Sequence, residues 1–484
     1  MTRHAISKTA VTALAVILVA WAVSCAINPV TGKNEIMLMS SADELAMGQQ
    51  TDPQILQTYG QYDDPELASY VAALGKRLGA LSHQPNLTYT VRVLDSPVVN
   101  AFAVPGGYVY LTRGILAYIN DEAELAGVMA HEIGHIAARH SAQQYSNAQL
   151  AQLGLGLGSA LSKTFRKYAG VAQAGVELLF MSFSRADERQ ADSLGVEYSA
   201  KAGYDSNHMA NLFVSLERLN PGESQGGLPG WFSTHPNPEN RIAAVKQDTL
   251  AWREKIQQTQ FAVNRDQYLR QIDGIVFGED PRQGYVEGHV FYHPQLRFQF
   301  PVPGGWKVNN TASQVQMINQ QQNAIILFSM APEKNPQAAA QAFINESKAA
   351  VVRSERTQVN GLQAQRVISD VTTEQGVIRI MSYFIKKGQT VYAFLGYTER
   401  SRFSGFSSVF EQTMGRFRNL SDANKINVKA DRLAVRRTIT QGSLRQALQK
   451  FGGPENKWED LAIINGMQLS DAVPRNTIIK FVVK

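Results

Sequence analysis

The sequence predicts an α+β fold, and three observations carry this prediction. Apolar residues recur at helical spacing through most of the first 270 residues, with a few short alternating segments between them. Beyond about Gln271, strand-like segments dominate, with two helical patterns among them. The last part of the chain, from Arg437 to Lys484, has the order strand, helix, helix, strand. A chain of 484 residues with 44% hydrophobic and 18% charged residues is globular and long enough for two to four domains.

These patterns predict where each part of the chain begins and ends. We expect a signal peptide over residues 1–24 and a mostly helical domain with a small sheet over residues 25–270. An α+β accessory domain is expected over residues 285–420, and a small βααβ module over residues 432–484. A polar linker around residues 421–431 separates the last two parts. The net charge of +6 is modest, and the sequence has no long Lys/Arg run, so we expect no nucleic acid partner.

The N-terminal segment predicts export. Arg3 and Lys8 precede an apolar run over residues 9–23, which has the length of a signal sequence and is short for a membrane span. The following Ala22-Val23-Ser24-Cys25 fits either ordinary cleavage or a lipobox with Cys25 as the acylated residue. The lipobox usually has Leu where Ala22 stands. Because Cys25 is the single cysteine and cannot form an internal disulfide, we expect it to be lipidated and to attach the chain to a membrane.

Two strands are expected before the first long helix of the catalytic region. Residues 87–93 alternate between apolar and polar side chains, and Tyr108 to Thr112 follow the turn at Gly106-Gly107. Asn100 to Ala103 lie between these strands. By pattern alone this segment reads as part of an ordinary hairpin with Phe102 in the core.

The segment His131-Glu132-Ile133-Gly134-His135 predicts a metal site. Two histidines four residues apart on a helix present both imidazoles to one ion, with a carboxylate beside them. Asp121 and Glu124 form a capping-box pattern, and apolar residues keep helical spacing through the motif. The alternative is a set of satisfied polar groups in a packed helix. His140, five residues after His135, is expected to turn away from the ligand face.

A catalytic zinc site needs a third protein ligand, and the best candidate is Glu188. Glu188 and Asp192 lie one helical turn apart, on a helix expected from about Val176 to Gly203. Taken alone, this pair reads as a solvated helix face with arginine partners. After the histidine motif, Glu188 instead completes a site of two histidines and one glutamate, with one Zn²⁺ per chain. Residues 149–175 are either a mobile amphipathic lid or membrane-facing surface, or a plain helix-loop-helix.

His235 lies in a loop that Pro236 and Pro238 stiffen, before a helix expected near Glu239. Three roles are open for this histidine. It packs at a helix entry, or it stabilises the oxyanion during catalysis, or it occupies the fourth position of the zinc at rest. We favour the last role, in which His235 acts as a latch that excludes water until substrate arrives.

The remaining elements follow from the apolar patterns of the C-terminal half. Strands are expected at residues 291–301, 324–330, 361–369, 377–385 and 390–395. Helices are expected at residues 338–352 and 403–416. The segment Phe298 to Trp306 resembles the opening of Mog-like or PsbP-like domains. In the last module we expect strands at Thr438-Ile439 and at residues 478–483, around helices at residues 444–451 and 458–465.

With these motifs the chain resembles the BepA-like bacterial metallopeptidases, which are relatives of the CAAX prenyl protease and the mitochondrial Oma peptidase. The resemblance runs from about Asn28 to Lys246. Five segments in the same order carry it: Asn28 to Gly32, Asn100 to Ala103 with Pro105 to Gly107, His131 to His140, Glu188 to Asp192, and Ser233 to Pro236 before Arg241. The last module resembles a LysM domain in its Ile464-Asn465-Gly466-Met467 turn, although Gly442-Ser443-Leu444 departs from the usual first-strand motif.

The resemblance implies a zincin fold, with zinc held by His131, His135 and Glu188. It implies Glu132 as general base and Asp192 as the partner of a ligand histidine or as a proton donor. Asn100, Ala101, Phe102 and Ala103 resemble the edge that pairs with an extended substrate. Ala26 after Cys25 favours the periplasmic face of the outer membrane, and the LysM-like module implies peptidoglycan as a partner, although its changed motif leaves glycan binding open.

Two functions are therefore consistent with the sequence. The first is an exported zinc-dependent endopeptidase that hydrolyses unfolded or misassembled cell-envelope proteins. The second is an envelope chaperone or peptidoglycan-associated scaffold whose zinc site is structural or rarely used. The intact Glu132 favours the first function, because a scaffold has no reason to keep the base.

Overall fold

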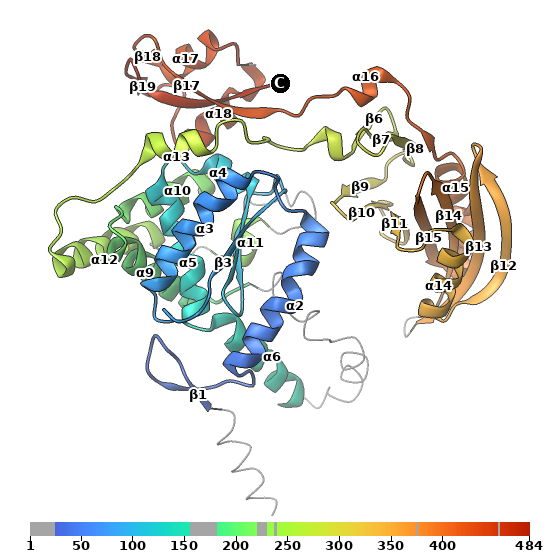
Figure 1. Ribbon diagram of the computed structural model, residues 1–484, viewed down its shortest axis with the longest axis horizontal. Coiled ribbons are helices and arrows are strands. Elements are labelled where there is room, and N and C mark those ends of the chain that lie inside the picture. Colours follow the sequence, from blue (N-terminus) through green and yellow to red (C-terminus); the bar gives the residue numbers. More distant parts are fainter. Residues whose placement is uncertain (1–24, 155–181, 220–229, 237–239, 374–375, 454) are drawn as a thin grey trace, which may run out of the picture.

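The computed structural model describes residues 25–154, 182–219, 230–236, 240–373, 376–453 and 455–484. It has a helical body around a small sheet, a large twisted sheet beside that body, and a compact C-terminal module above it (Figure 1). The expected α+β fold is confirmed. The signal peptide and most of the segment expected as a lid, residues 155–175, lie outside the described residues. Among the helices of the described ranges, none is long and apolar enough to cross a membrane.

The body begins with short elements that lead to its sheet. Strands β1 (Cys25–Ile27) and β2 (Asn34–Ile36) form a hairpin, and helices α2 (Ser41–Tyr59) and α3 (Pro65–Ala80) follow. The sheet has the order β3-β5-β4, with β3 (Thr90–Leu94) parallel to β5 (Tyr108–Thr112) and β4 (Ala101–Val104) antiparallel to it. The strand predicted at residues 108–112 is confirmed, and β4 lies at an edge of the sheet.

Helix α5 (Glu122–Ala137) is the centre of the body, and all of its residues are buried. It packs against α3, α9 (Arg185–Lys201), α10 (Asn207–Glu217) and the sheet, because its apolar residues cover every side of it. The other helices of the body are α4 (Arg113–Tyr118), α6 (His140–Gly154), α11 (Trp231–Thr234), α12 (Arg241–Ile256) and α13 (Arg265–Gln271). The start predicted for α9 at Val176 was wrong: Ser184 caps the helix, and residues 182–184 are not helical.

Beyond the body, β6 (Tyr285–Glu287), β7 (Val290–His293), β8 (Phe298–Pro301) and β16 (Arg418–Asn419) form a four-stranded sheet. The strand predicted over residues 291–301 is therefore two strands, β7 and β8, which form a hairpin. A seven-stranded antiparallel sheet has the order β12-β13-β14-β15-β11-β10-β9. Its strands are β9 (Lys307–Asn310), β10 (Gln314–Ile318), β11 (Ala324–Ala331), β12 (Ala350–Val359), β13 (Leu362–Thr373), β14 (Gly376–Lys387) and β15 (Thr390–Glu399).

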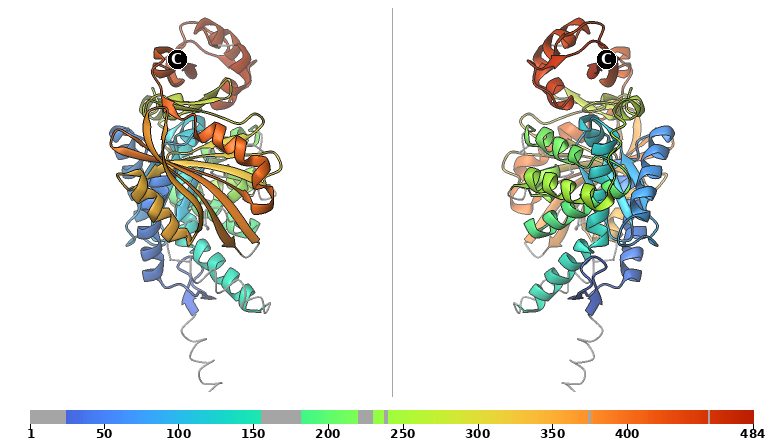
Figure 2. Two further views of the ribbon diagram at one scale, coloured as in Figure 1. Left: turned by 90° about the vertical axis from the view of Figure 1, so that its right-hand side faces the viewer. Right: turned by 90° about the vertical axis from the view of Figure 1, so that its left-hand side faces the viewer.

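Two helices cover opposite faces of the seven-stranded sheet (Figure 2, left). Helix α14 (Pro336–Ser347) packs on β13 and β14, and α15 (Phe403–Met414) packs on β15 and β8. The predicted continuation of α14 to Val352 was wrong. Lys348 has a left-handed φ of 51°, which ends the helix, and Ala350 already begins β12.

The C-terminal module has the expected strand-helix-helix-strand order. Strand β17 (Arg432–Arg437) pairs antiparallel with β20 (Ile478–Val483), and helices α17 (Leu444–Lys450) and α18 (Trp458–Ile464) lie between them. The first strand was predicted at Thr438-Ile439, but it ends at Arg437. The short strands β18 (Gly442–Ser443) and β19 (Ala472–Val473) also pair, and the linker carries the short helix α16 (Ala423–Ile426). Apolar residues of the module, such as Leu433 and Ile479, belong to the same core as α5.

Candidate metal centre

The site is built where α5 and α9 cross. Asp121 caps α5 by accepting a hydrogen bond from the Glu124 backbone N–H at 2.8 Å, and a capping box of Ser184 and Asp187 starts α9. The helices approach closely at Gly134, where a Cβ atom would lie 3.1 Å from the Leu194 Cβ. This close crossing brings the ligand face of α5 against the first turns of α9.

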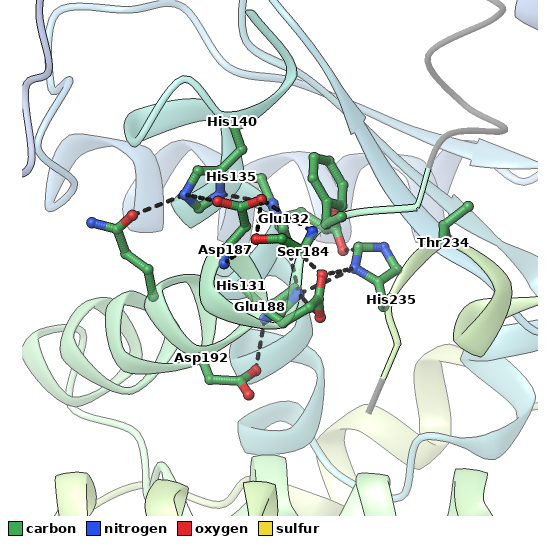
Figure 3. Close-up of polar contacts among 12 residues, drawn as sticks. His131, Glu132, His135, His140, Ser184, Asp187, Glu188, Asp192, Thr234 and His235 are labelled. Atoms are coloured by element: carbon green, nitrogen blue, oxygen red, sulfur yellow. Dashed lines mark hydrogen bonds and ion pairs between the residues drawn. The ribbon is translucent and has the colours of Figure 1, made fainter. Parts of the chain in front are cut away.

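Four buried side chains converge there: His131 and His135 from α5, Glu188 from α9, and His235 after α11 (Figure 3). The His131 and His135 Nε2 atoms are 3.1 Å apart. The Glu188 carboxylate oxygens lie 3.6 Å from His131 Nε2 and 3.4 Å from His135 Nε2. The His235 Nδ1 atom is 3.0 Å from Glu188 Oε1 and 3.4 Å from His131 Nε2.

These separations fit a tetrahedral zinc ion. Ligand bonds of ~2.0–2.1 Å place neighbouring donor atoms ~3.3 Å apart on a tetrahedron, and the donor pairs here lie 3.0–3.6 Å apart. Three nitrogens and one carboxylate are a donor set that suits zinc. The two oxygens of the buried Glu132 carboxylate have no hydrogen-bond partner among the described residues, so this group is free to act on a bound molecule.

Protonation also favours metal binding. Burial lowers the pKa of His135 well below its usual value, so this imidazole is neutral. Burial alone would raise the pKa of Glu188, but the neighbouring histidines His235, His135 and His131 outweigh it and hold the pKa well below its usual range. A neutral histidine and an ionised carboxylate are the forms that bind a metal ion.

Asp192 lies behind His131 rather than beside the donor atoms. Its Oδ1 atom is 2.9 Å from His131 Nδ1, which leaves His131 Nε2 facing the cluster. Asp192 Oδ1 also accepts a hydrogen bond of 2.7 Å from Arg241 Nη2, and the same guanidinium lies 3.3 Å from Glu188 Oε2. Arg241 is buried and stacks over Phe213 at 3.9 Å. Arg241 stands in one of the family-like segments of the sequence, but no role was expected for it.

His140 is not among the four clustered donors, as expected from its turn away from the ligand face, but it lies closer to them than helical spacing predicts. Its Nδ1 atom is 3.0 Å from His135 Nδ1, and its Nε2 atom is 2.9 Å from the Gln190 amide oxygen. The reason is that α5 ends at Ala137 and Arg139 takes a left-handed φ of 59°, so the chain turns back and α6 starts at His140. The spacing of residues within a helix cannot predict that the chain turns back after the helix ends.

This arrangement fixes the tautomer of His135. Burial lowers the pKa of His140, which is therefore neutral. Its Nε2–H donates to the Gln190 oxygen, so its Nδ1 atom accepts, and the donor must be His135 Nδ1–H. The lone pair of His135 Nε2 then faces the cluster, as a metal ligand requires.

Two aromatic rings enclose the histidines. The Phe183 ring stacks on His135 with centroids 4.0 Å apart, and the Trp231 ring stacks on His235 at 4.3 Å. Neither ring was expected at the site, because neither residue lies in a metal-ligand motif. Burial raises the pKa of Glu132, and its nearest titratable contact is His235 Nε2, 3.6 Å from Oε1.

The segment predicted as a substrate edge lies at an edge of the sheet and also places Phe102 in the core. Ala101 to Ala103 belong to β4, whose strand partner in the described sheet is β5 on one side only. Phe102 is 5% exposed and stacks on Tyr110 at 4.9 Å, so its ring is in the core. Asn100 precedes the strand and is buried.

Residues 65–249 match Peptidase family M48. The chain is 30% identical over 227 residues to the beta-barrel assembly-enhancing protease of Escherichia coli, which covers 45% of this chain and 46% of that protein. It is 35% identical over 188 residues to a putative beta-barrel assembly-enhancing protease of Vibrio cholerae, covering 37% and 38%. With the mitochondrial metalloendopeptidase OMA1 of Schizosaccharomyces pombe it shares 30% identity over 230 residues, covering 45% and 65%.

The chain thus spans less than half the length of the bacterial relatives it matches. Among solved structures, cyanobacterial PsbP from Synechocystis is similar at a TM-score of 0.23 and 14% identity, covering 28% of this chain and 98% of that one. The Ran-binding protein Mog1p of Saccharomyces cerevisiae is similar at a TM-score of 0.23 and 10% identity, covering 29% and 99%.

Proposed function

We propose that this chain, whose residues 65–249 form a Peptidase family M48 domain, is a zinc-dependent endopeptidase. Its substrates are unfolded or misassembled cell-envelope proteins. One observation carries the proposal: the buried Glu132 carboxylate, which has no hydrogen-bond partner among the described residues, lies 3.6 Å from His235, a member of the donor cluster of His131, His135 and Glu188. A carboxylate that can act as a base beside metal ligands is needed for hydrolysis, whereas a purely structural metal site does not need one.

In this proposal His131, His135 and Glu188 hold one zinc ion. When bound, zinc supplies Lewis-acid polarisation to the scissile carbonyl and to the attacking water. Glu132 takes the proton from that water and later delivers it to the leaving amine. Burial raises the pKa of Glu132 above its usual value, which makes the carboxylate a stronger base for the proton of the attacking water.

Asp192 and His140 act as positioning residues behind the two ligand histidines. Asp192 Oδ1 lies 2.9 Å from His131 Nδ1, and His140 accepts the Nδ1–H of His135, so both Nε2 atoms face the cluster of donor atoms. Each acceptor also raises the basicity of its imidazole. Asp192, proposed from sequence as a partner of a ligand histidine or a proton donor, is better suited to the first role, because it lies behind His131.

Substrate would bind as an added strand along β4, at Asn100, Ala101, Phe102 and Ala103. Pairing with an edge strand uses backbone hydrogen bonds, so selectivity for sequence is weak and the substrate must be unfolded locally. His235, as the fourth donor of the cluster, would act as the latch that leaves when substrate arrives.

The proposal also includes the cellular location of the enzyme. The bacterial relatives are named for assembly of beta-barrel proteins, which supports substrates of the cell envelope. Lipidated Cys25 would attach the chain to the periplasmic face of the outer membrane, and the LysM-like module would add peptidoglycan as a partner. The competing function, a chaperone or scaffold with a rarely used zinc site, has the same location.

The test compares wild type with Glu132→Gln and Glu188→Ala. Glu132→Gln is expected to keep one zinc per chain and to lose casein hydrolysis by ~10²- to 10⁴-fold, since a general base contributes about that factor. Glu188→Ala is expected to lose the metal, because two imidazoles alone bind zinc weakly. Zinc is measured by elemental analysis of the purified proteins. Equal hydrolysis by Glu132→Gln and wild type would overturn Glu132 as the general base, whereas zinc-loaded wild type without hydrolysis would favour the scaffold.

A further inference from the structure

A cavity of about 510 Å³ lies between the body and the C-terminal module. Residues 97–99, which lead into β4, and residues 230–233, which lead into His235, form two of its walls. Residues 276–278 and two residues of α18, Asp460 and Ile463, close it from the other side. The cavity is therefore reached by the two chain segments that run directly into the candidate site, and a module distant in sequence completes it.

We infer that this cavity binds apolar side chains of the extended polypeptide substrate, and that the C-terminal module supplies one wall of the substrate-binding site. This inference rests on the proposed peptidase function. A strand added along β4 that continues past Ala101 runs alongside residues 97–99, which line the cavity. Its volume suits a few side chains, because ligand pockets commonly measure ~300–1,000 Å³.

Trp231 connects the cavity to the metal centre. Its ring stacks on His235 at 4.3 Å, and its backbone N–H donates to the Val99 carbonyl at 3.1 Å. Its indole Nε1–H is buried and has no hydrogen-bond partner among the described residues, while the side chain is 2% exposed. Trp231 thus lines the cavity and contacts His235 of the candidate metal centre.

The walls favour apolar side chains over acidic ones. Leu219, Phe232, Phe277 and Ile463 line the cavity, and each is partly exposed. Arg113 of the wall is already paired with a carboxylate, and Arg218 uses one of its N–H groups on a backbone carbonyl. Arg113 Nε donates to Asp95 at 2.6 Å and its Nη1 to the Val276 carbonyl at 3.0 Å, and Arg218 Nη1 donates to the Met467 carbonyl at 2.7 Å. The exposed carboxylate of Asp460 at the same cavity repels acidic side chains further.

The wall formed by the module is held rigidly. The buried Lys480 Nζ donates to the carbonyls of Ala117 and Ile119, each at 2.8 Å, at the C-terminal end of α4. The bond from Arg218 to Met467 ties the module to the end of α10. Ile463 is therefore fixed relative to Trp231, and its side chain can select among substrates without first having to be ordered.

The test uses Ile463→Glu, with Ile439→Glu as matched control. Ile463 is half-buried and lies outside the shared core, whereas Ile439 is 75% exposed on the same module and does not line this cavity. Each protein is also made with Glu132→Gln, so that binding is measured by fluorescence anisotropy without turnover. The ligands are two labelled unstructured peptides, one with Leu and Phe at alternate positions and one with Ser in their place.

We expect Ile463→Glu to weaken binding of the Leu/Phe peptide about tenfold, which corresponds to one lost apolar contact of about 1.4 kcal/mol. In the proteins with Glu132 intact, KM should rise by a similar factor while kcat, zinc content and Tm stay unchanged. Ile439→Glu and the Ser peptide should show no difference. If Ile463→Glu lowers Tm, Ile463→Ala replaces it, with a smaller loss expected.

The inference and the proposed function fail in different ways. Hydrolysis by wild type, combined with equal Kd for Ile463→Glu and wild type on the Leu/Phe peptide, would overturn the cavity as a substrate site. A tenfold loss of binding in Ile463→Glu, together with no hydrolysis by any protein, would support the cavity and overturn the peptidase. A loss shared equally by Ile439→Glu would also overturn the cavity, because the charge alone would then be the cause.

Discussion

Arg241 is a buried cation between two buried carboxylates, one a candidate ligand and the other the partner of a ligand histidine. A guanidinium in that place lets both carboxylates stay ionised out of water, which an unpaired buried charge could not do. Its Nε and Nη1 atoms have no partner among the described residues, so its hydrogen bonding is directed to these two groups. Arg241 is thus a positioning residue for the metal centre.

We predict that Arg241→Met lowers zinc affinity about 10- to 100-fold, the usual range for loss of a partner behind metal ligands. Arg241→Lys should recover part of it, because an ammonium group keeps the charge but not the fork of two N–H groups. Competition with a chromophoric chelator measures the affinity, and Tm of the metal-free protein controls for folding. Unchanged zinc affinity in Arg241→Met would leave Arg241 with a packing role only.

His235 offers a second prediction at this scale. It is fully buried beside Glu188, and burial lowers its pKa while Glu188 and Glu132 raise it by more, so the net pKa is above the usual value. If His235 is the latch, His235→Ala retains zinc and cleaves unfolded casein at least as fast as wild type. Loss of ~10²-fold or more in kcat with zinc retained would assign His235 to oxyanion stabilisation. Steady-state kinetics on zinc-loaded protein decides between them.

At the scale of elements, α10 is tied to the start of α5 by a titratable contact. His208 Nδ1 lies 2.6 Å from Asp121 Oδ2, and Asp121 is the N-cap of α5. Burial lowers the pKa of His208, but the hydrogen bond and charge of Asp121 outweigh it and raise the pKa above the usual value. A raised folded-state pKa adds stability that is complete below about pH 6.5, the unfolded value, and is lost as pH rises through the folded value.

We therefore predict that the Tm difference between wild type and His208→Gln shrinks as pH rises from 6 to 8.5. Glutamine keeps a hydrogen bond to Asp121 but carries no charge at any pH, so it removes only the titrating part. Differential scanning fluorimetry across this pH series gives the comparison. A Tm difference that stays constant over the series would rule out titration of His208 as its source.

The elements differ in how far the sequence could reveal them. The start of α5 follows from the capping residues Asp121 and Glu124 and a long apolar pattern, and these local signals suffice. Strands β9 and β10 were missed because they are short and rich in polar residues. The end of α14 at Ser347 depends on a left-handed Lys348, a conformation that lysine rarely signals.

For the site as well, local sequence patterns predict some residues, whereas others depend on tertiary packing. His131, His135, Glu188 and His235 could be proposed from spacing and family motifs, and the fold places their donor atoms together. His140 could not, because its position depends on one backbone angle at Arg139. Arg241, Phe183 and Trp231 approach the site from segments whose relative positions only tertiary packing determines.

At the scale of the whole molecule, the C-terminal module packs directly against the body. A module that only followed a linker in the sequence would not need such a contact. Lys480 is fully buried between them, and burial lowers its pKa to about 7 while Glu124 of α5 opposes that shift. The module was expected to follow a polar linker, and that linker does precede it, but the linker leads the chain back onto the body (Figure 1). Sequence patterns describe a module's own strands and helices, not the surface on which it packs.

One hydrophobic core extends from Leu67 through α5 to Val482, whereas the cores on the two faces of the seven-stranded sheet consist of residues between Phe291 and Phe417. Elements that share a core melt together, so heating should separate the chain into two cooperative units: the segment around the seven-stranded sheet, and a larger unit formed from residues on both sides of that segment. Calorimetry is expected to show two transitions, one of which contains both ends of the described chain. A chain that stops near residue 430 is therefore expected to lose stability in the larger unit as well as the module, because residues of the module belong to the core of that unit.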